Sequence, residues 1–289
     1  MKKFLFLLVV LSLSACSIAA VSPIGLLKNP LSENTNRKRI RHIEDYLYDS
    51  YFFVKIDVKF KIKLGEYLKQ NPFYEMLLKG NVNPEQIIEE EKIGFGSSFL
   101  IFNNAQKNKS FLLTNEHVCD IHNRIKNVIE KKVTIHICTK ENICFISNEI
   151  ASNKKQDLCL LQSKFLKNKN IVYISKRPAK KFDTVYNSAL SGAEMIAISE
   201  GRIRIDYLPL VKGMYYGTAF FSLDGEKTKY LRSAFNWNAY GGNSGSPIIN
   251  EYGELVSVLN SGSTTQDRTF GITHREILEF LNTNRKNFN

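Results

Sequence analysis

The chain has 289 residues, a formal net charge of +12, and 43% hydrophobic and 11% aromatic residues. Its basic residues are scattered among Asn and Ile rather than gathered into a stripe interleaved with aromatic residues, which argues against a nucleic-acid-binding protein. A positive surface can attract acidic partners or anionic lipids, although compositional bias is the simpler explanation. Beyond the N-terminal apolar run, roughly 270 residues remain, enough for one large β domain or two small domains sharing a core.

The N-terminus has the pattern of an export signal. Lys2 and Lys3 precede the apolar run Phe4 to Leu11, which is shorter than the roughly 20 residues of a membrane-spanning helix. The letters LSAC, ending at Cys16, resemble the bacterial lipobox, whose cysteine is lipidated and becomes the mature N-terminus. Cleavage after Ala19 stays open as an alternative.

We therefore expect a signal peptide over residues 1–15 and a tether over 16–44, joined to the membrane through a lipid on Cys16. Ser17 stands where an aspartate would resemble an inner-membrane retention signal. The expected location is thus the cell envelope of a bacterium, as an outer-membrane lipoprotein on its periplasmic or surface face.

Four cysteines remain beside Cys16. Cys138 and Cys144 flank the letters TKENI as they would across a hairpin, and this predicts a disulfide in an exported protein. Cys119 and Cys159 either pair or stay buried and free. Their spacing relative to the histidines is not typical of a zinc site, so we expect no metal and no other cofactor.

The elements expected after the tether are mostly short strands. Residues 51–62 alternate as a strand does, and residues 65–92 have helical spacing interrupted by Pro72 and Pro84, which predicts a helical insertion. Residues 275–283 predict a short C-terminal helix. The other β-rich runs are 94–102, 110–114, 132–138, 143–146, 158–162, 171–174, 184–188, 201–205, 215–223, 247–249, 255–259 and 269–272. Many short strands with few helices predict an all-β barrel or sandwich.

Residues 241–247 read GGNSGSP and place Ser244 among glycines. The glycines indicate backbone shapes that a β-carbon would obstruct. One interpretation is a tight turn before the strand Ile248–Ile249. The other is a serine nucleophile beside bare backbone N–H groups, which needs a histidine base and an acid elsewhere in the chain.

A base and an acid are present in suitable positions. His117 follows the apolar strand 111–113, and Asp157 is the one carboxylate in the apolar stretch QDLCLLQ. A buried carboxylate is costly unless it accepts hydrogen bonds, and a histidine Nδ1–H would supply one. Taken singly, His117 could be a core histidine and Asp157 a strand-start cap. Together with Ser244 they predict a catalytic triad.

The stretches LLTNEHVCD, QDLCLLQ and GGNSGSPIINEYGELVSV resemble those of the chymotrypsin-fold serine endopeptidases of bacteria, especially the staphylococcal glutamyl endopeptidases and the HtrA/Deg proteases. The resemblance covers residues 51 to about 283 and implies an all-β protease domain (45–289) that cleaves polypeptides. Its two packed six-stranded antiparallel barrels would span about 45–165 and 170–273. The site would lie between them, with the N–H groups of Gly242 and Ser244 as the oxyanion hole.

Departures from these relatives bear on activation and specificity. Asn243 stands where zymogen-activated relatives carry an aspartate, so activation through an ion pair with a new N-terminus is not expected. Leu259 stands where glutamate-preferring relatives carry a histidine, so that specificity does not carry over. With Asn260, it would line the substrate pocket. Asn238 would lie near the base of that pocket, and its neutral amide predicts small or uncharged P1 residues.

Two rival interpretations remain. The letters GNSGS nearly match the elbow of α/β-hydrolases, with Asp267 and His274 following in order, but Ser246 replaces the last glycine and no strand–helix alternation supports that fold. His274 is more easily explained as a cap of the final helix. The stronger rival is a catalytically silent binding or chaperone module of the envelope. The sequence does not define the oligomeric state. After the protease domain we expect no room for a PDZ domain.

Overall fold

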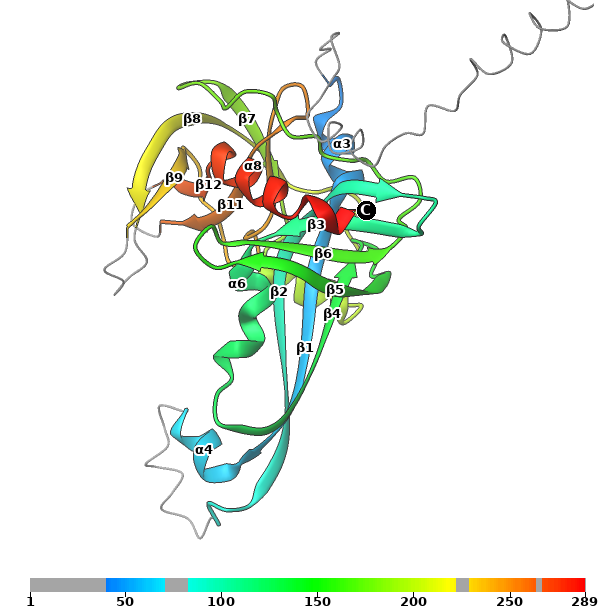
Figure 1. The fold of residues 1–289 in the computed structure, drawn as a ribbon, viewed down its shortest axis with the longest axis vertical. Coiled ribbons are helices and arrows are strands. Elements are labelled where there is room, and N and C mark those ends of the chain that lie inside the picture. The colour runs from blue at the N-terminus through cyan, green and yellow to red at the C-terminus, as the bar shows by residue number, and fades with distance from the viewer. Residues whose placement is uncertain (1–39, 71–82, 222–228, 264–266, 289) are drawn as a thin grey trace, which may run out of the picture.

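The computed structural model describes residues 40–70, 83–221, 229–263 and 267–288. Within these residues the strands form two closed antiparallel barrels, in the orders β1-β2-β3-β6-β5-β4 and β10-β11-β12-β9-β8-β7 (Figure 1). The predicted all-β fold of two six-stranded barrels is confirmed. The expected signal peptide, Cys16 and most of the expected tether lie outside the described residues. Among those described, no helix is both long enough and apolar enough to cross a membrane.

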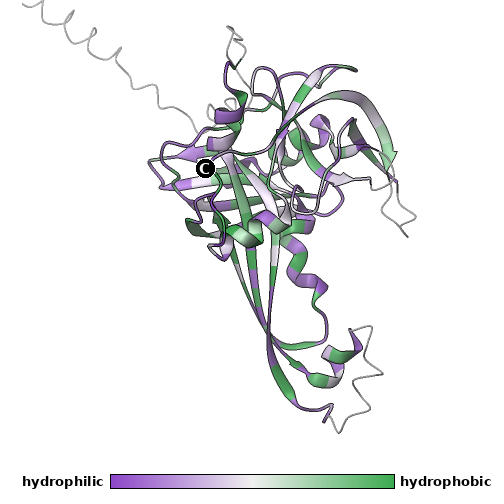
Figure 2. Ribbon diagram, turned by 180° about the vertical axis from the view of Figure 1, so that it is seen from behind, coloured by the Kyte–Doolittle hydropathy of each residue, from purple (hydrophilic) through white to green (hydrophobic). Residues whose placement is uncertain are grey.

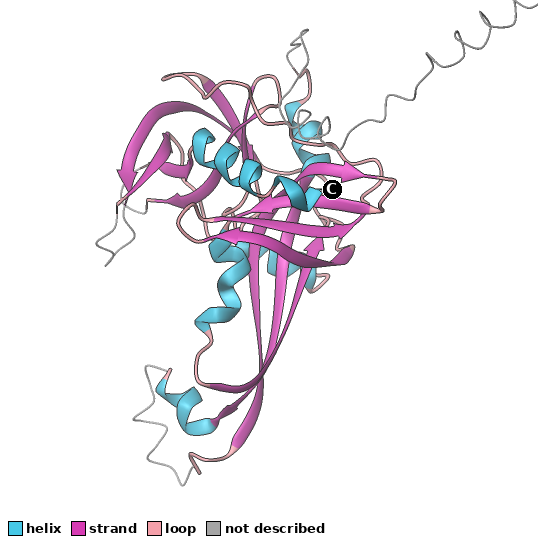
Figure 3. Ribbon diagram, in the orientation of Figure 1, coloured by secondary structure: helices cyan, strands magenta, loops and turns pink. Residues whose placement is uncertain are grey.

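The first barrel and its connections occupy the N-terminal half of the described chain. Strands predominate in the fold, and the helices are short (Figure 3). Their bounds are α3 (Ile43–Ser50), β1 (Tyr51–Lys63), α4 (Leu64–Lys69), β2 (Ile87–Asn104), β3 (Lys109–Thr114), α6 (Glu116–Cys119), η1 (Asp120–Arg124), β4 (Val128–Cys138), β5 (Cys144–Asn153) and β6 (Leu158–Lys164). Alternate residues of β1 point into the barrel, which gives this strand the period-2 burial that its sequence predicts.

The second barrel is followed by a helix that packs back onto the strands. Its bounds are β7 (Thr184–Ser188), α7 (Gly192–Ser199), β8 (Leu210–Phe221), β9 (Tyr230–Phe235), β10 (Pro247–Asn250), β11 (Leu255–Gly262), β12 (Thr269–Ile272), α8 (His274–Thr283) and η2 (Arg285–Phe288). The C-terminal helix was expected at this place. Its N-cap is Thr273, in a capping box with Glu276, rather than His274. The His274 ring instead bonds the carbonyl of Ser175 through Nε2, at 2.6 Å.

In the described part of the chain, the expected helical insertion is helical at its start and a β-strand at its end. Only α4 is helical there, and residues 87–92 belong to β2, which pairs with β1 along a long arm (Figures 1 and 2). Opposite charges face each other across this arm, with Lys61 against Glu89 at 3.5 Å. Such cross-strand pairs favour a hairpin, whereas the spacing of apolar residues alone suggested a helix. Residues 71–82 of the insertion lie outside the described part.

Three other details differ from the sequence-based expectations. Residues 201–205 form no strand, because Gly201 ends α7 with φ +69°. Residues 171–174 contribute only a bridge from Ile174 to Leu255. The stretch expected as tether already joins the fold at Ile40, whose N–H donates to the carbonyl of Glu251.

Hydrogen bonds between the barrels hold the loop that carries Ser244. On β2, the Ser97 N–H donates to the carbonyl of Ser244 and the Ser97 hydroxyl donates to the carbonyl of Gly242, both at 2.8 Å. The Tyr51 hydroxyl bonds the Ser97 hydroxyl at 3.0 Å and accepts the Leu190 N–H at 3.2 Å. The first barrel therefore fixes where the serine loop of the second barrel lies.

The Tyr51 contact can be tested by removing one oxygen atom. Tyr51→Phe leaves the buried N–H of Leu190 without its acceptor, so we expect the free energy of unfolding to fall by about 1–3 kcal/mol. Urea denaturation followed by fluorescence measures the change. Tyr207→Phe is the matched control because Tyr207 is 75% exposed, and equal losses in both variants would contradict the proposed role of Tyr51.

Candidate active site

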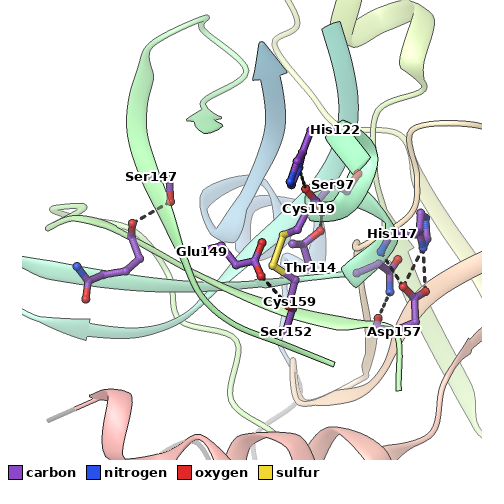
Figure 4. The surroundings of a disulfide bond; sticks show 12 residues. Ser97, Thr114, His117, Cys119, His122, Ser147, Glu149, Ser152, Asp157 and Cys159 are labelled. Carbon is purple, nitrogen blue, oxygen red and sulfur yellow. Dashed lines mark hydrogen bonds and ion pairs between the residues drawn. A yellow bond between two sulfur atoms is a disulfide. The ribbon is translucent and has the colours of Figure 1, made fainter. Parts of the chain in front are cut away.

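His117 and Asp157 meet at the end of the first barrel. His117 lies on α6, directly after β3, and Asp157 immediately precedes β6. The His117 Nδ1 atom is 2.8 Å and 3.0 Å from the two carboxylate oxygens of Asp157 (Figure 4). The backbone N–H of His117 also donates to this carboxylate, at 2.9 Å. Donation from Nδ1–H leaves Nε2 as the free acceptor, which is the tautomer of a general base.

The Asp157 carboxylate is buried and its position is held from several sides. The residue is 8% exposed and has φ +55°, an uncommon conformation for a residue with a side chain. Asn115 holds the backbone by donating to the Asp157 carbonyl at 3.0 Å. Asn260 of β11 donates its amide to Oδ2 of the carboxylate. These donors offset the cost of burying the charge.

A disulfide joins the segments that carry His117 and Asp157. Cys119 and Cys159 each follow one of these residues by two positions, and their sulfurs are bonded, with a Cα–Cα distance of 6.6 Å (Figure 4). This settles a pairing that the sequence left open. The two sulfurs also form, with Glu149, the single cluster of potential metal ligands among the described residues. Because both sulfurs are in the disulfide, this cluster is not a metal site.

Ser244 reaches the same place from the second barrel. Its hydroxyl donates to the carbonyl of Asn260 at 3.1 Å, and the Asn260 amide binds Asp157. Asn260 therefore connects the serine to the His117–Asp157 pair. No hydrogen bond joins Ser244 to His117 among the described residues, and contacts between catalytic groups often tighten only when substrate binds.

The backbone around Ser244 presents two unused donors. The N–H groups of Gly242 and Ser244 donate to no acceptor in the described part of the chain, whereas those of Asn243 and Gly245 bond the carbonyls of Tyr240 and Leu259. Gly242 has φ +99°, and a Cβ on it would lie 2.4 Å from the nitrogen of Gly192. Glycine is therefore required for the backbone shape that leaves the two N–H groups free to bind an oxyanion.

Asn243 completes this loop without an ion pair. Its side-chain nitrogen, Nδ2, donates to the carbonyl of Leu190 at 3.0 Å, and its side-chain oxygen accepts the backbone N–H of Tyr240 at 2.8 Å. Asn243 is buried, and a neutral amide needs no cationic partner there. The loop is thus held by contacts internal to the second barrel and by Ser97.

The residues expected to line the substrate pocket differ in their exposure. Leu259 is 1% exposed and packs in the core of the second barrel. Asn238 is exposed and donates to Asp267 at 2.9 Å. Beside it, a Cβ on Gly262 would lie 2.8 Å from the carbonyl oxygen of Ala239. These two segments therefore lie in direct contact and leave no room for a large side chain between them.

Sequence reasoning identified the motif residues but missed several that support them. Asn260 was expected as a pocket residue; it lines the pocket beside the site and in addition bonds both Ser244 and Asp157. Ser97 was missed altogether, and the signal was the pair of serines within the apolar strand GFGSSFLIF. Arg232, on β9, lies beside the site in a pocket of about 240 Å³, and nothing in its sequence context marks it.

Comparisons with known proteins bear on the fold. No family model matches the sequence, and no curated protein matches it either. Among solved structures, the chain is similar to the active form of Rv3671c protease from M. tuberculosis, with a TM-score of 0.52, 14% identity, and coverage of 85% of this chain and 87% of that chain. The inactive form of Rv3671c protease matches with a TM-score of 0.50, 14% identity, and coverage of 85% and 96%. Together with the two closed six-stranded barrels, these neighbours identify the fold as that of the chymotrypsin-like serine proteases.

Proposed function

We propose that the protein is a serine endopeptidase in which His117, Asp157 and Ser244 form the catalytic triad. The observation that carries the proposal is the convergence of three parts: an oriented His117–Asp157 pair, Ser244 linked to it through Asn260, and two free N–H groups beside the serine. A binding module with the same fold has no use for all three. The fold of a serine protease adds to this argument.

Each part has a defined step in the proposed reaction. Nε2 of His117 takes the proton of the Ser244 hydroxyl as its oxygen attacks the scissile carbonyl carbon, and then gives it to the leaving amine. Asp157 stays ionised and stabilises the imidazolium. The negative oxygen of the tetrahedral intermediate accepts hydrogen bonds from the N–H groups of Gly242 and Ser244, each worth about 3–4 kcal/mol of transition-state stabilisation. Water then releases the acyl group from Ser244.

The proposed activity is tested by removing the nucleophile and the base separately. Ser244→Ala and His117→Ala are each expected to lower kcat/KM for an unstructured protein such as casein by at least about a thousandfold, because the members of a triad act as a unit. The measurement is release of new peptide amines, with thermal unfolding as the check on folding. Full activity of a folded Ser244→Ala variant would exclude this mechanism, and an inactive wild type would favour the silent binding module.

The disulfide beside the pair should matter for rate as well as for stability. Replacing Cys119 and Cys159 by serine is expected to lower kcat by about 10–100-fold, since a displacement of about 1 Å in a catalytic group costs that much. The control is the same change at Cys138 and Cys144, which form a disulfide away from the pair. Steady-state kinetics and unfolding temperatures are compared for both double variants. Equal effects on kcat would show that the first disulfide acts only through stability.

The preference at P1 follows from the contact between Gly262 and Ala239. We propose that this subsite accepts alanine or glycine, in agreement with the small or uncharged residues expected from Asn238. Peptides that differ only at P1 are expected to be cleaved at least about tenfold faster with alanine than with phenylalanine, because a large side chain has to separate packed backbone segments. Equal kcat/KM values for the two peptides would show that the segments separate freely.

We also propose that the protein is exported and anchored through a lipid on Cys16. The chain has five cysteines, and the four described ones pair with each other. Disulfides persist in oxidising compartments outside the cytosol. Cys16 is the one cysteine that does not belong to either of these two disulfides. This supports the lipobox resemblance and an envelope location. No nucleic-acid partner is proposed.

Lipidation is tested in a bacterial host that has the lipoprotein machinery. The wild-type chain is expected to incorporate an alkyne fatty acid and to partition into detergent, because acyl chains bind membranes through burial of their methylene groups. Cys16→Ser is expected to abolish both. Labelling of the Cys16→Ser chain would place the lipid elsewhere, and an unlabelled but exported wild type would favour cleavage after Ala19.

A further inference from the structure

A pocket of about 240 Å³ opens beside the His117–Asp157 pair, and the proposed peptidase chemistry does not explain its lining. It is bounded by both barrels, with His117 and Asp157 on one side and Asn260 and Ser261 of β11 on another. Small-molecule sites typically have about 300–1,000 Å³, so this volume suits one or two side chains. Because it adjoins Asn260, which binds Ser244, a substrate held at the serine would pass its entrance.

The lining carries an unusual number of cations. Arg124, Lys154 and Arg232 all face the pocket. Arg124 and Lys154 are exposed and form no ion pair among the described residues. The aromatic residues Phe221 and Tyr230 complete this part of the lining.

Arg232 is the most informative of the three, because it is buried and only partly used. Its side chain is 4% exposed, and one terminal nitrogen donates to Glu276 at 2.9 Å. The guanidinium carbon lies 5.1 Å from the centre of the Tyr230 ring. The Nε atom is buried and has no hydrogen-bond partner in the described part of the chain. A buried donor of this kind is unfavourable unless an acceptor arrives.

From this lining we propose that the pocket binds an acidic side chain of the polypeptide substrate close to the scissile bond. A carboxylate entering the pocket would meet Arg124 and Lys154 at its open side and supply the acceptor that Arg232 lacks. Hydrogen bonds between a guanidinium and a carboxylate are among the strongest in proteins. The inference rests on the proposed peptidase activity, since it assigns the pocket to that substrate.

Two acidic residues also line the pocket, and neither cancels the cations. Both oxygens of Asp157 already accept from His117 or Asn260. Burial raises the pKa of the Glu116 carboxyl, and the charges of Asp120 and Asp157 raise it further, while Lys154 lowers it. Glu116 is thus the one acidic side chain not engaged by the site; it interacts electrostatically with Lys154, so the lining sets three cations against this one carboxyl group.

The first experiment measures binding, so that it does not depend on turnover. Fluorescent peptides carry Glu or Gln at each position in turn on both sides of the scissile bond, and their affinities for the full mature Ser244→Ala chain are compared by anisotropy. At one position we expect Glu to bind about tenfold more tightly than Gln, the size of one charge-assisted contact. Equal affinities at every position would overturn the proposal.

Variants then locate the preference. The double change Arg124→Gln and Lys154→Gln is expected to bring the Glu/Gln ratio near one. The matched control is Lys126→Gln with Lys155→Gln, which removes the same charge from exposed neighbouring positions outside the pocket. The control is expected to keep the ratio, and an equal loss in both double variants would assign the preference to general surface charge and overturn the proposal.

Arg232→Lys tests the buried donor, because it keeps a charge for Glu276 while removing the Nε–H group. We expect a lower Glu/Gln ratio in a chain that remains folded, as its unfolding temperature checks, and an unchanged ratio would overturn the role given to the buried donor of Arg232. Cleavage by the chain with Ser244 separates the two claims. Preferential binding of Glu peptides without cleavage would refute the peptidase activity and support the acidic-side-chain pocket. Cleavage without any preference for Glu would support the peptidase activity and refute the pocket.

Discussion

The geometry of the candidate site depends on a short set of hydrogen bonds between the two barrels at Ser97. This residue lies on a strand of the first barrel, yet its N–H and hydroxyl bind the carbonyls of Ser244 and Gly242 in the second. The packing there is close, since a Cβ on Gly245 would lie 2.1 Å from the Ser97 carbonyl oxygen. Because His117 belongs to the first barrel and Ser244 to the second, this contact fixes the position of the proposed nucleophile relative to the barrel that carries the proposed base.

The second constraint is the buried charge of Asp157. Water is excluded from most of this carboxylate, so its position is set by the donors that His117, Asn260 and the backbone supply. The same bonds orient the imidazole and tie β11, which carries Asn260, to the first barrel. The Cys119–Cys159 disulfide joins the segments that carry His117 and Asp157 covalently. Stability and proposed chemistry therefore use the same contacts, and the glycines of the serine loop serve both.

Much of this could be predicted from the sequence, because local signals report local constraints. The alternation of residues 51–62 reflects the two faces of a barrel strand, and GGNSGSP reflects a backbone that must leave N–H groups free. The parts that failed depend on distant partners. The end of the expected helical insertion, residues 87–92, instead pairs with β1, where opposite charges face each other across the strands. Asn260 lines the pocket beside the site but also binds Asp157, and Leu259 packs in the core of the second barrel, to which β11 belongs. The position of Arg232 beside the site could not be predicted from its neighbours in the sequence, because its partner Glu276 is distant along the chain.

The most direct test of the proposed triad is reaction of the folded chain with a fluorophosphonate, followed by mapping of the modified residue by mass spectrometry. This reagent phosphonylates serines that a neighbouring base has activated. The proposed triad predicts rapid modification at Ser244 in the wild type and its loss in a folded His117→Ala variant. A folded wild type that stays unmodified at Ser244, or a His117→Ala variant that reacts equally fast, would contradict it.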